Sequence, residues 1–240
     1  MQKIISLYTG LPHYQADIDT VTAIKKSTVN SALYVDENGV TGDGVGDTKR
    51  HGGTERVLHQ YPSENYHQWL ERINLAPHAP KFKPSLFGEN ISSSGMNEKD
   101  TYIGDIYRIG SALLQVSQPR KPCWKLNWRT EVANASLFMQ TSGLTGWFYR
   151  VIEPGFIEPG DSITLVERAP QPMSIFTIVS ELYAEVESAG DMTVLNQTAL
   201  HEIAENSLLS ENWRKVARER LKTGVIENWH HRLFGPTITV

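Results

Sequence analysis

Length, composition and charge already exclude several classes of protein. The chain has 240 residues, one cysteine and a formal net charge of −4, so it is long enough to bury a core and has no internal disulfide framework. An acidic chain is a poor candidate for binding a nucleic-acid polymer, which needs a dominant basic surface. The sequence has no apolar run long enough to span a membrane and no N-terminal secretory signal, so we expect a cytoplasmic protein.

Short strands and a glycine-rich loop make up the first part of the chain. The segments 3–7, 20–24 and 31–35 fit short strands, and residues 36–39 are typical of a turn. Residues 42–53 hold five glycines, too many for a helix and too polar for a core strand. Four basic or imidazole side chains surround a Gly-Gly pair, where a ligand can approach backbone N–H groups: Lys49, Arg50, His51 and Arg56. The loop is therefore either a plain surface loop or part of an anion-binding site.

A strand, a helix and a polar turn follow. Residues 56–60 predict a strand, and Pro62 suits the first turn of a helix that ends near Asn74. Next comes Phe87-Gly-Glu-Asn90, in which the Asn90 amide can act as donor and acceptor in a site or simply form a turn.

The middle of the chain predicts more short strands, at 100–109, 112–118, 145–151 and 159–166, with a helix-like stretch over 131–141. Short strands separated by glycine turns at this spacing indicate a mainly β protein with a closed or nearly closed β-barrel. Arg150 lies on the opposite face of its strand from Trp147 and Tyr149. It is either a solvated charge or a second anion ligand.

The only cysteine, Cys123, follows the strand at 112–118 and lies between two prolines and a tryptophan, so we expect it on a rigid loop at the strand end. Five basic residues and no acidic residue lie between Tyr107 and Thr130: Arg108, Arg120, Lys121, Lys125 and Arg129. Positive charge favours the thiolate, the form that attacks electrophiles and binds metals. The alternative is a buried cysteine that acts as a small apolar side chain.

The sequence changes character at residues 169–172, where we place a boundary between a β domain over 1–168 and a C-terminal domain over 169–240. Helical patterns cover about 174–188 and 196–206, and a third helix runs from Ser210, a good N-cap, to Gly224. We therefore expect a small three-helix domain. His230 and His231 look like part of an ordinary tail.

The order of these motifs resembles the MOSC family, and the resemblance extends from about residue 25 to residue 166. Its most specific element is Gln118-Pro-Arg-Lys-Pro-Cys123, and the other matching segments are Gly44–Asp47, Arg50–Gly53, Phe87–Asn90, Gly104-Asp105, Gly146–Val151 and Pro159–Asp161. The three C-terminal helices resemble the appendage of YiiM-like members of the family.

The resemblance implies a β-barrel with a bound molybdenum cofactor, that is, molybdenum held by molybdopterin. It makes Cys123 the catalytic residue and the metal ligand, a role that suits a soft thiolate. Candidates for cofactor contact are Lys49, Arg50, His51, Asn90, Arg120 and Arg150.

For YiiM-like members the resemblance further implies an oxidoreductase that converts N-hydroxylated base analogues, such as 6-N-hydroxylaminopurine, to the amine. The chain has no cysteine set for an iron–sulfur cluster and no dinucleotide fingerprint, so the electrons must come from a separate reductase or ferredoxin-like partner. A homodimer is a further expectation from the family.

Three other functions stay open at the level of sequence. The protein can carry sulfur as a Cys123 persulfide or carry the cofactor itself, or it can be a cofactor-free hydrolase in which His51 activates Cys123. A zinc enzyme is the weakest option because no His-Glu-x-x-His motif is present.

Overall fold

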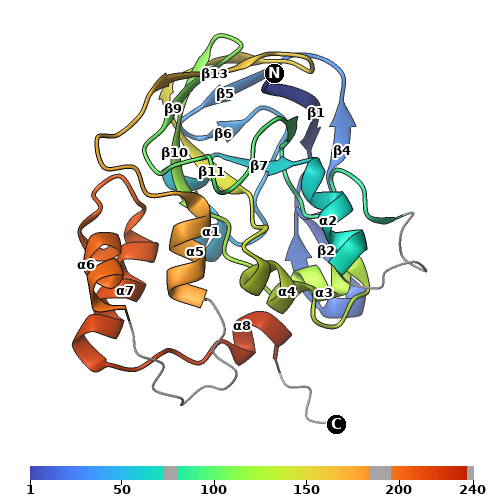
Figure 1. The fold of residues 1–240 in the computed structure, drawn as a ribbon. Helices are drawn as coiled ribbons and strands as arrows, with labels where there is room; N and C mark the ends of the chain where they lie inside the picture. Colours follow the sequence, from blue (N-terminus) through green and yellow to red (C-terminus); the bar gives the residue numbers. More distant parts are fainter. Residues whose placement is uncertain (73–80, 184–195, 237–240) are drawn as a thin grey trace.

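The computed structural model describes residues 1–72, 81–183 and 196–236, and of Lys49 and Arg50 it describes the backbone alone. Its main element is an eight-stranded mixed sheet with the strand order β13-β9-β10-β11-β7-β8-β1-β4 (Figure 1). The strands are β1 (Lys3–Thr9), β4 (Ser27–Val29), β7 (Leu58–Pro62), β8 (Ile91–Ser94), β9 (Ile106–Ile109), β10 (Ala112–Pro119), β11 (Trp147–Glu153) and β13 (Ile163–Glu167). Only β7 and β8 pair in parallel; the other neighbours are antiparallel.

Two smaller sheets complete the β structure. One contains β12 (Gly155–Ile157), β5 (Leu33–Asp36) and β6 (Gly39–Val40), and the other is a hairpin of β2 (His13–Gln15) and β3 (Thr20–Thr22). The short 3-10 helix η1 (Ala16–Ile18) joins the two strands of the hairpin. The mainly β expectation is therefore confirmed.

The expected barrel is not confirmed, because no continuous ladder closes the large sheet among the described residues. The edge strand β13 does approach β1, which is next to the other edge strand, β4. A single bridge pairs Lys3 with Ser162, and the Ile163 N–H donates to the Gln2 carbonyl at 2.9 Å. The sheet thus bends back on its first strand through a few hydrogen bonds only.

Helices cover one end of the sheet. In the first part of the chain they are α1 (Thr48–His51), the 3-10 helix η2 (Thr54–Arg56), α2 (Glu64–Arg72), α3 (Lys125–Thr130) and α4 (Ala135–Ser142); near the C-terminus they are α5 (Ile175–Tyr183), α6 (Gln197–Glu205), α7 (Glu211–Thr223) and α8 (His230–Phe234). The expected helices at 196–206 and from Ser210 to Gly224 are confirmed, and Gly224 is in the left-handed region at the C-cap. The Asn196 side chain caps α6 by accepting from Ala199 N–H, whereas Ser210 precedes α7 without a side-chain cap bond. Residues 74 and 184–188, where two expected helices end, lie outside the described residues.

Four local expectations were wrong. The glycine-rich loop contains one helical turn, α1, because no glycine occupies 48–51. Pro62 ends β7 instead of starting α2. The helix expected over 131–141 begins later, as α4 at Ala135, and an unexpected helix, α3, begins two residues after Cys123. The C-terminal tail contains the helix α8, so the described part of this region has four helices.

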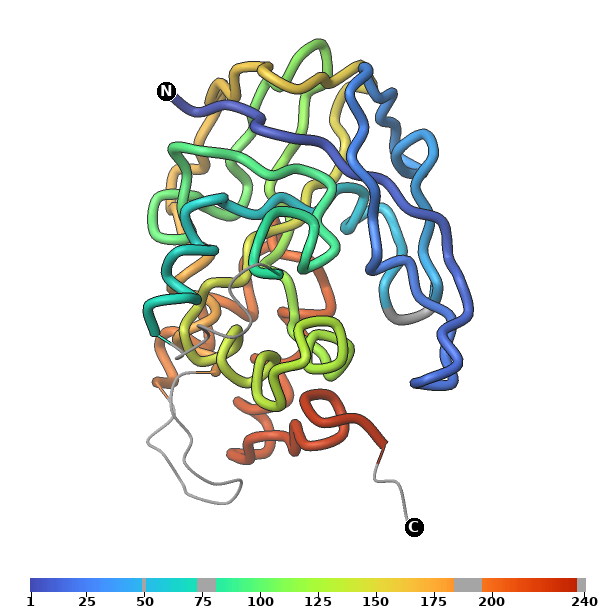
Figure 2. Tube along the Cα trace, turned by 90° about the vertical axis from the view of Figure 1, so that its right-hand side faces the viewer, coloured from blue at the N-terminus to red at the C-terminus, as the bar shows by residue number. Residues whose placement is uncertain are grey.

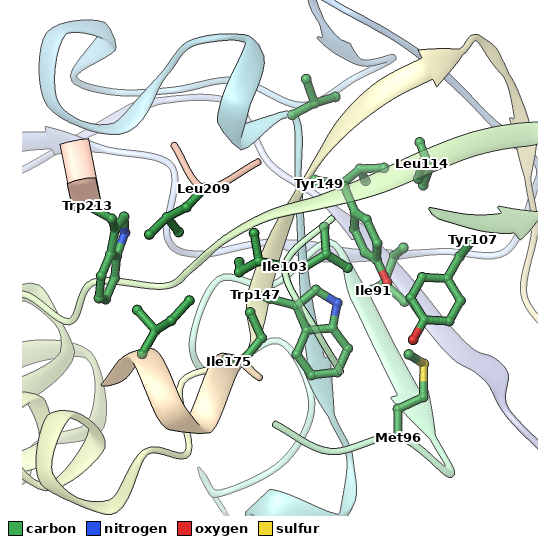
Figure 3. Close-up of a cluster of buried hydrophobic side chains, with 14 of the residues drawn as sticks. Ile91, Met96, Ile103, Tyr107, Leu114, Trp147, Tyr149, Ile175, Leu209 and Trp213 are labelled. Carbon is green, nitrogen blue, oxygen red and sulfur yellow. The ribbon is translucent and has the colours of Figure 1, made fainter. Parts of the chain in front are cut away.

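One hydrophobic core runs from the sheet into the C-terminal helices. Trp147 and Tyr149 of β11 belong to the same buried cluster as Ile175 of α5 and Trp213 of α7, as Figure 3 shows. A second cluster lies between α2, α3 and α4, around Tyr61 and Trp69. The boundary at residues 168 and 169 stays a prediction, but the two parts it separates share a core. None of the described helices is both long enough and apolar enough to cross a bilayer.

Candidate functional site

The Cys123 loop connects the end of β10 to the start of α3. Pro119 is the last residue of β10 and pairs with Trp147, and the next N–H, that of Arg120, donates to the Gly146 carbonyl at 3.3 Å. The Cys123 carbonyl then accepts from Leu126 N–H at 3.0 Å as α3 begins. The free thiol is half-buried. The expectation that Cys123 lies on a loop at a strand end is confirmed.

Cys123 lies where two adjoining hollows meet. We call them the inner recess, of about 140 Å³, and the outer cavity, of about 620 Å³. The inner recess lies between the β2–β3 hairpin, the glycine-rich loop and the Phe87–Asn90 turn. The outer cavity extends toward α7 and α8. Both are lined by the same central group: Asp47, His51, Arg56, Arg120, Cys123, Lys125 and Phe148.

Basic side chains dominate the described lining of both hollows. Six of them, Lys26, Arg56, Arg120, Lys121, Lys125 and Arg232, face two carboxylates, Asp43 and Asp47. The local charge is therefore positive although the whole chain is acidic. Such a hollow suits an anionic ligand.

Arg120 is the most informative of these cations. It is only 9% exposed, and its side chain makes one hydrogen bond, from Nη1 to Met139 Sδ at 3.4 Å. It forms none of the ion pairs found among the described residues. Burial lowers the pKa of its guanidinium, and the largest opposing influence is the charge of Cys123, ahead of Glu89. A buried cation without a carboxylate partner costs stability, so its place beside the thiol indicates a role in binding.

His51 is kept neutral in the site. The His51 side chain is exposed at the rim of the hollows. Partial loss of hydration and the charges of Lys125, Arg56 and Arg120 lower the pKa of its imidazole, while Asp47 raises it. At neutral pH the imidazole therefore offers one donor and one acceptor nitrogen and adds no charge.

Asn90 holds the wall of the inner recess together. Its Nδ2 donates to Asp43 Oδ2 at 2.7 Å and to the Tyr8 carbonyl at 3.2 Å, and its Oδ1 accepts from His59 N–H at 3.1 Å. Asp43 in turn accepts from Gly10 N–H at 2.8 Å and pairs with Lys26. Asn90 lines the inner recess, but its amide already makes three hydrogen bonds within the protein. Its role is therefore to position Asp43.

Lys26 and His59 also line the inner recess. Burial lowers the pKa of the Lys26 ammonium, against the opposing effect of Asp43. Burial likewise lowers the pKa of His59, whose ring stacks on Phe148 at 4.9 Å with its Nε2 3.3 Å from the Thr145 carbonyl. Both polar side chains therefore lie in a poorly hydrated wall.

The structure brings together Cys123, His51, Asn90 and Arg120 from the predicted set. It does not bring Arg150 to them. The Arg150 guanidinium donates to Glu55 Oε2 at 3.0 Å from Nε, to Gln115 Oε1 at 2.9 Å and to the Leu208 carbonyl at 2.8 Å. It joins β11 to η2 and to the segment before α7. The side chains of Lys49 and Arg50 lie outside the described residues.

Three of the five cations that lie close to Cys123 in sequence also line the hollows. Arg120, Lys121 and Lys125 line the hollows, whereas Arg108 pairs with Glu153 at 3.5 Å on the exposed side of the sheet. Arg129 lies in α3 and does not line either hollow.

Several functional residues were missed by sequence reasoning. Lys26 precedes β4, and Asp43 and Asp47 lie in the glycine-rich loop. Asn212, Trp213, His231 and Arg232 reach the outer cavity from α7 and α8. Arg56 of η2 and Lys125 of α3, which the sequence had marked as nearby cations, also line both hollows. The four-residue spacing of Trp229 and Leu233 is a weak signal for the short helix α8. No local pattern indicates that this helix lies beside Cys123.

Comparisons with known proteins agree with this geometry. The model of the MOSC domain matches residues 47–164, a range that includes Cys123. Protein YiiM of Escherichia coli is 34% identical over 236 residues, which cover 98% of this chain and 100% of that protein. A protein named Reductase from Gibberella moniliformis is 31% identical over 206 residues, which cover 85% of this chain and 35% of that protein.

Solved structures are similar over the same length. The crystal structure of YiiM from Escherichia coli superimposes with a TM-score of 0.76 at 31% identity, covering 98% of this chain and 100% of that one. The crystal structure of YiiM from Geobacillus stearothermophilus gives a TM-score of 0.73 at 31% identity, covering 92% and 100%. The likeness therefore includes the C-terminal helices as well as the sheet.

Proposed function

The chain belongs to the MOSC domain family, and on that premise we propose that it is a molybdenum-cofactor-dependent reductase that converts N-hydroxylated compounds, such as 6-N-hydroxylaminopurine, to amines. The observation that carries the proposal is the buried, ion-pair-free Arg120 beside the half-buried Cys123 thiol. A metal held by an anionic organic group needs both a soft donor and a cation.

The described residues fit the molybdenum cofactor. Cys123 would supply the protein's thiolate ligand to the metal, and Arg120, Arg56 and Lys125 would neutralise the phosphate of molybdopterin. His51, which is neutral, would donate or accept a hydrogen bond to the cofactor and would leave neutralisation of the phosphate to the cations. Lys49 and Arg50 remain candidates for the same role, whereas Arg150 and Asn90 are committed to holding the surrounding structure.

When bound, this cofactor would supply the two electrons that, together with two protons, convert the N-hydroxylated substrate to the amine and water. The protein binds and orients the substrate. The outer cavity falls within the usual size of small-molecule sites, about 300–1,000 Å³, and Trp124, Trp213 and Phe148 line it beside Asn212. These side chains suit a planar heteroaromatic ring with polar edges.

The electrons come from a separate protein in this proposal. The single cysteine cannot hold an iron–sulfur cluster. A reductase or ferredoxin-like donor is therefore part of the proposal, and so is a homodimer.

A carrier of sulfur or of the cofactor is the second candidate, because the half-buried Cys123 opens to a large cavity through which a partner can reach it. The hydrolase alternative is disfavoured. Among the described residues no hydrogen bond joins His51 to the Cys123 thiol, and the lowered pKa of the His51 imidazole makes it a weaker base.

Turnover distinguishes the two candidates. Protein from cells that make the molybdenum cofactor is mixed with dithionite-reduced methyl viologen and 6-N-hydroxylaminopurine, and adenine is measured by chromatography. We expect many turnovers in the wild type and in Arg108→Ala, a control on the exposed side of the sheet, and none in Cys123→Ala. A cofactor-loaded wild type that reduces no N-hydroxylated compound would instead favour a carrier.

A further inference from the structure

We propose that Arg232 of α8 is the positioning residue for Cys123 and that the C-terminal helix is therefore part of the active site. The functional consequence rests on the proposed function, because a misplaced thiol would hold the metal poorly. The geometric claim does not depend on any cofactor.

Arg232 bonds the peptide groups on both sides of Cys123. Its Nη1 donates to the Pro122 carbonyl at 2.6 Å, in the peptide that precedes the cysteine. Its own carbonyl accepts from Trp124 N–H at 2.7 Å, in the peptide that follows. One residue thus holds the peptide groups on both sides of the cysteine, and this sets the direction in which its side chain leaves the backbone.

The guanidinium is itself held in place. Nη2 donates to Gln140 Oε1 of α4 at 2.6 Å, and the guanidinium carbon lies 5.3 Å from the centre of the Tyr183 ring of α5. Burial lowers the pKa of Arg232, and Cys123 is among the groups whose charge acts against this effect. Since the side chain is fixed from two further helices, it can act as a rigid support for the loop.

The helix that carries Arg232 is anchored directly to the helices around the cysteine. The Leu233 carbonyl accepts from Asn127 Nδ2 at 2.8 Å and from Ser136 Oγ at 2.6 Å, and the Leu233 side chain is buried. Figures 1 and 2 show α8 lying against the green α3 and α4 segments. The C-terminal region therefore reaches past the sheet to complete the loop that bears the thiol.

This arrangement assigns the C-terminal region a role at the site. Arg232 and His231 line the outer cavity with Asn212 and Trp213 of α7. Loss of α8 would remove one wall of the cavity and also the support of Cys123.

The test is amide hydrogen exchange, resolved by NMR, in metal-free protein. Arg232→Ala keeps the main-chain carbonyl that accepts from Trp124 N–H, but it removes the guanidinium bond to the Pro122 carbonyl. Because the loop should then open more readily, we expect the Trp124 amide to exchange about tenfold faster, the size expected for loss of a hydrogen bond from a charged group, while amides of the core strand β11 are unchanged. Arg232→Lys keeps the charge and can restore one bond, so it should give a smaller effect. Arg218→Ala, which removes a guanidinium of α7 that pairs with Glu211 outside the cavity, is the control and should leave Trp124 unchanged.

An unchanged Trp124 exchange rate in Arg232→Ala would overturn the proposal, and so would equal acceleration of the β11 amides, which indicates a general loss of stability. If Arg232→Ala does not fold, Gln140→Met removes an acceptor of the guanidinium without altering α8. The Trp124 amide should then exchange about threefold faster, because the hydrogen bond that is lost is weaker. An unchanged exchange rate in this variant would reject the claim. If the wild-type protein contains no molybdenum, the proposed effect of Arg232 on metal binding fails. The measured effect of Arg232 on the Cys123 loop would still stand.

Discussion

Arg120 and Arg150 show how one residue type serves opposite purposes in this protein. Arg150 has acceptors on Glu55, Gln115 and Leu208 and so contributes to stability. Arg120 is buried with only a methionine sulfur as acceptor, and it lies beside the thiol. Residues that bind ligands often lower the stability of the free protein. Comparing the free energy of unfolding after replacement of Arg120 and of Arg150 measures this effect.

Replacing Arg120 with Met should separate stability from binding. Because the change removes a buried cation that has no carboxylate partner, we expect the metal-free protein to become more stable by about 1 kcal/mol, with loss of bound pterin. Denaturant unfolding and the fluorescence of released pterin measure the two effects. Arg150→Met is the matched comparison, and it should lose about 1–3 kcal/mol and retain the pterin. A less stable Arg120→Met protein that still binds pterin would contradict this assignment.

Sequence reasoning identified the residues whose chemistry is local and missed those that depend on distant packing. Cys123 was recognisable because it follows a clear strand and stands in a specific Pro-Cys context. Arg150 was a poor choice because its partners come from η2 and from the segment before α7, and no sequence spacing indicates such contacts.

At the scale of elements, the turn before β11 holds the site together. Gly146 has a φ of +63°, and an added Cβ would lie 2.3 Å from the Gln60 carbonyl oxygen. Its N–H donates to Glu98 Oε1 at 2.8 Å and its carbonyl accepts from Arg120 N–H. This glycine thus allows β7 and β11 to pair closely and also sets the start of the Cys123 loop.

Gly146→Ala should therefore destabilise the protein by about 3 kcal/mol or more, because a backbone clash adds to an unfavourable φ. The free energy of unfolding in urea measures the effect. Gly160→Ala is the control, since its φ is also positive, at +96°, but the added Cβ meets nothing within 4 Å. Equal losses in the two variants would show that strain alone, and not the contact with β7, decides the cost.

Strands and long helices were predictable from periodicity, whereas short elements were not. β10, α6 and α7 were found because apolar positions repeat over at least eight residues. α1, α3 and α8 contain at most six residues each, so they form only because tertiary contacts hold them. These three short helices surround the candidate site, and its shape was therefore the least predictable part of the fold.

At the scale of the whole molecule, the sheet and the C-terminal helices are joined by a common core and by buried polar links. Glu98 is one such link. Its Oε1 accepts from Asn65 Nδ2 and from Gly146 N–H, each at 2.8 Å, and its own carbonyl accepts from Phe176 N–H in α5 at 2.8 Å. Burial raises the pKa of this carboxyl to about 7, although these hydrogen bonds lower it.

The raised pKa of Glu98 predicts how stability depends on pH. Its folded-state pKa lies above the ordinary value of 4.5, so its contribution is complete below about pH 4.5 and is lost as the pH rises through about 7. Between about pH 5 and pH 8 the wild type should lose roughly 2–3 kcal/mol relative to Glu98→Gln, which keeps Oε1 and does not ionise. Urea unfolding of both proteins across this range measures the difference. A constant difference in stability would mean that the carboxyl titrates normally.

Molybdenum and pterin content is the most direct test of the central claim, that Cys123 and the cations around it hold a molybdenum cofactor. The protein is purified from a host that makes the cofactor, and metal is measured by mass spectrometry and pterin by fluorescence after release. The account predicts molybdenum and pterin equimolar with the wild-type chain and with the Arg108→Ala control, and loss of the metal in Cys123→Ala. A wild-type protein that contains neither molybdenum nor pterin would contradict it.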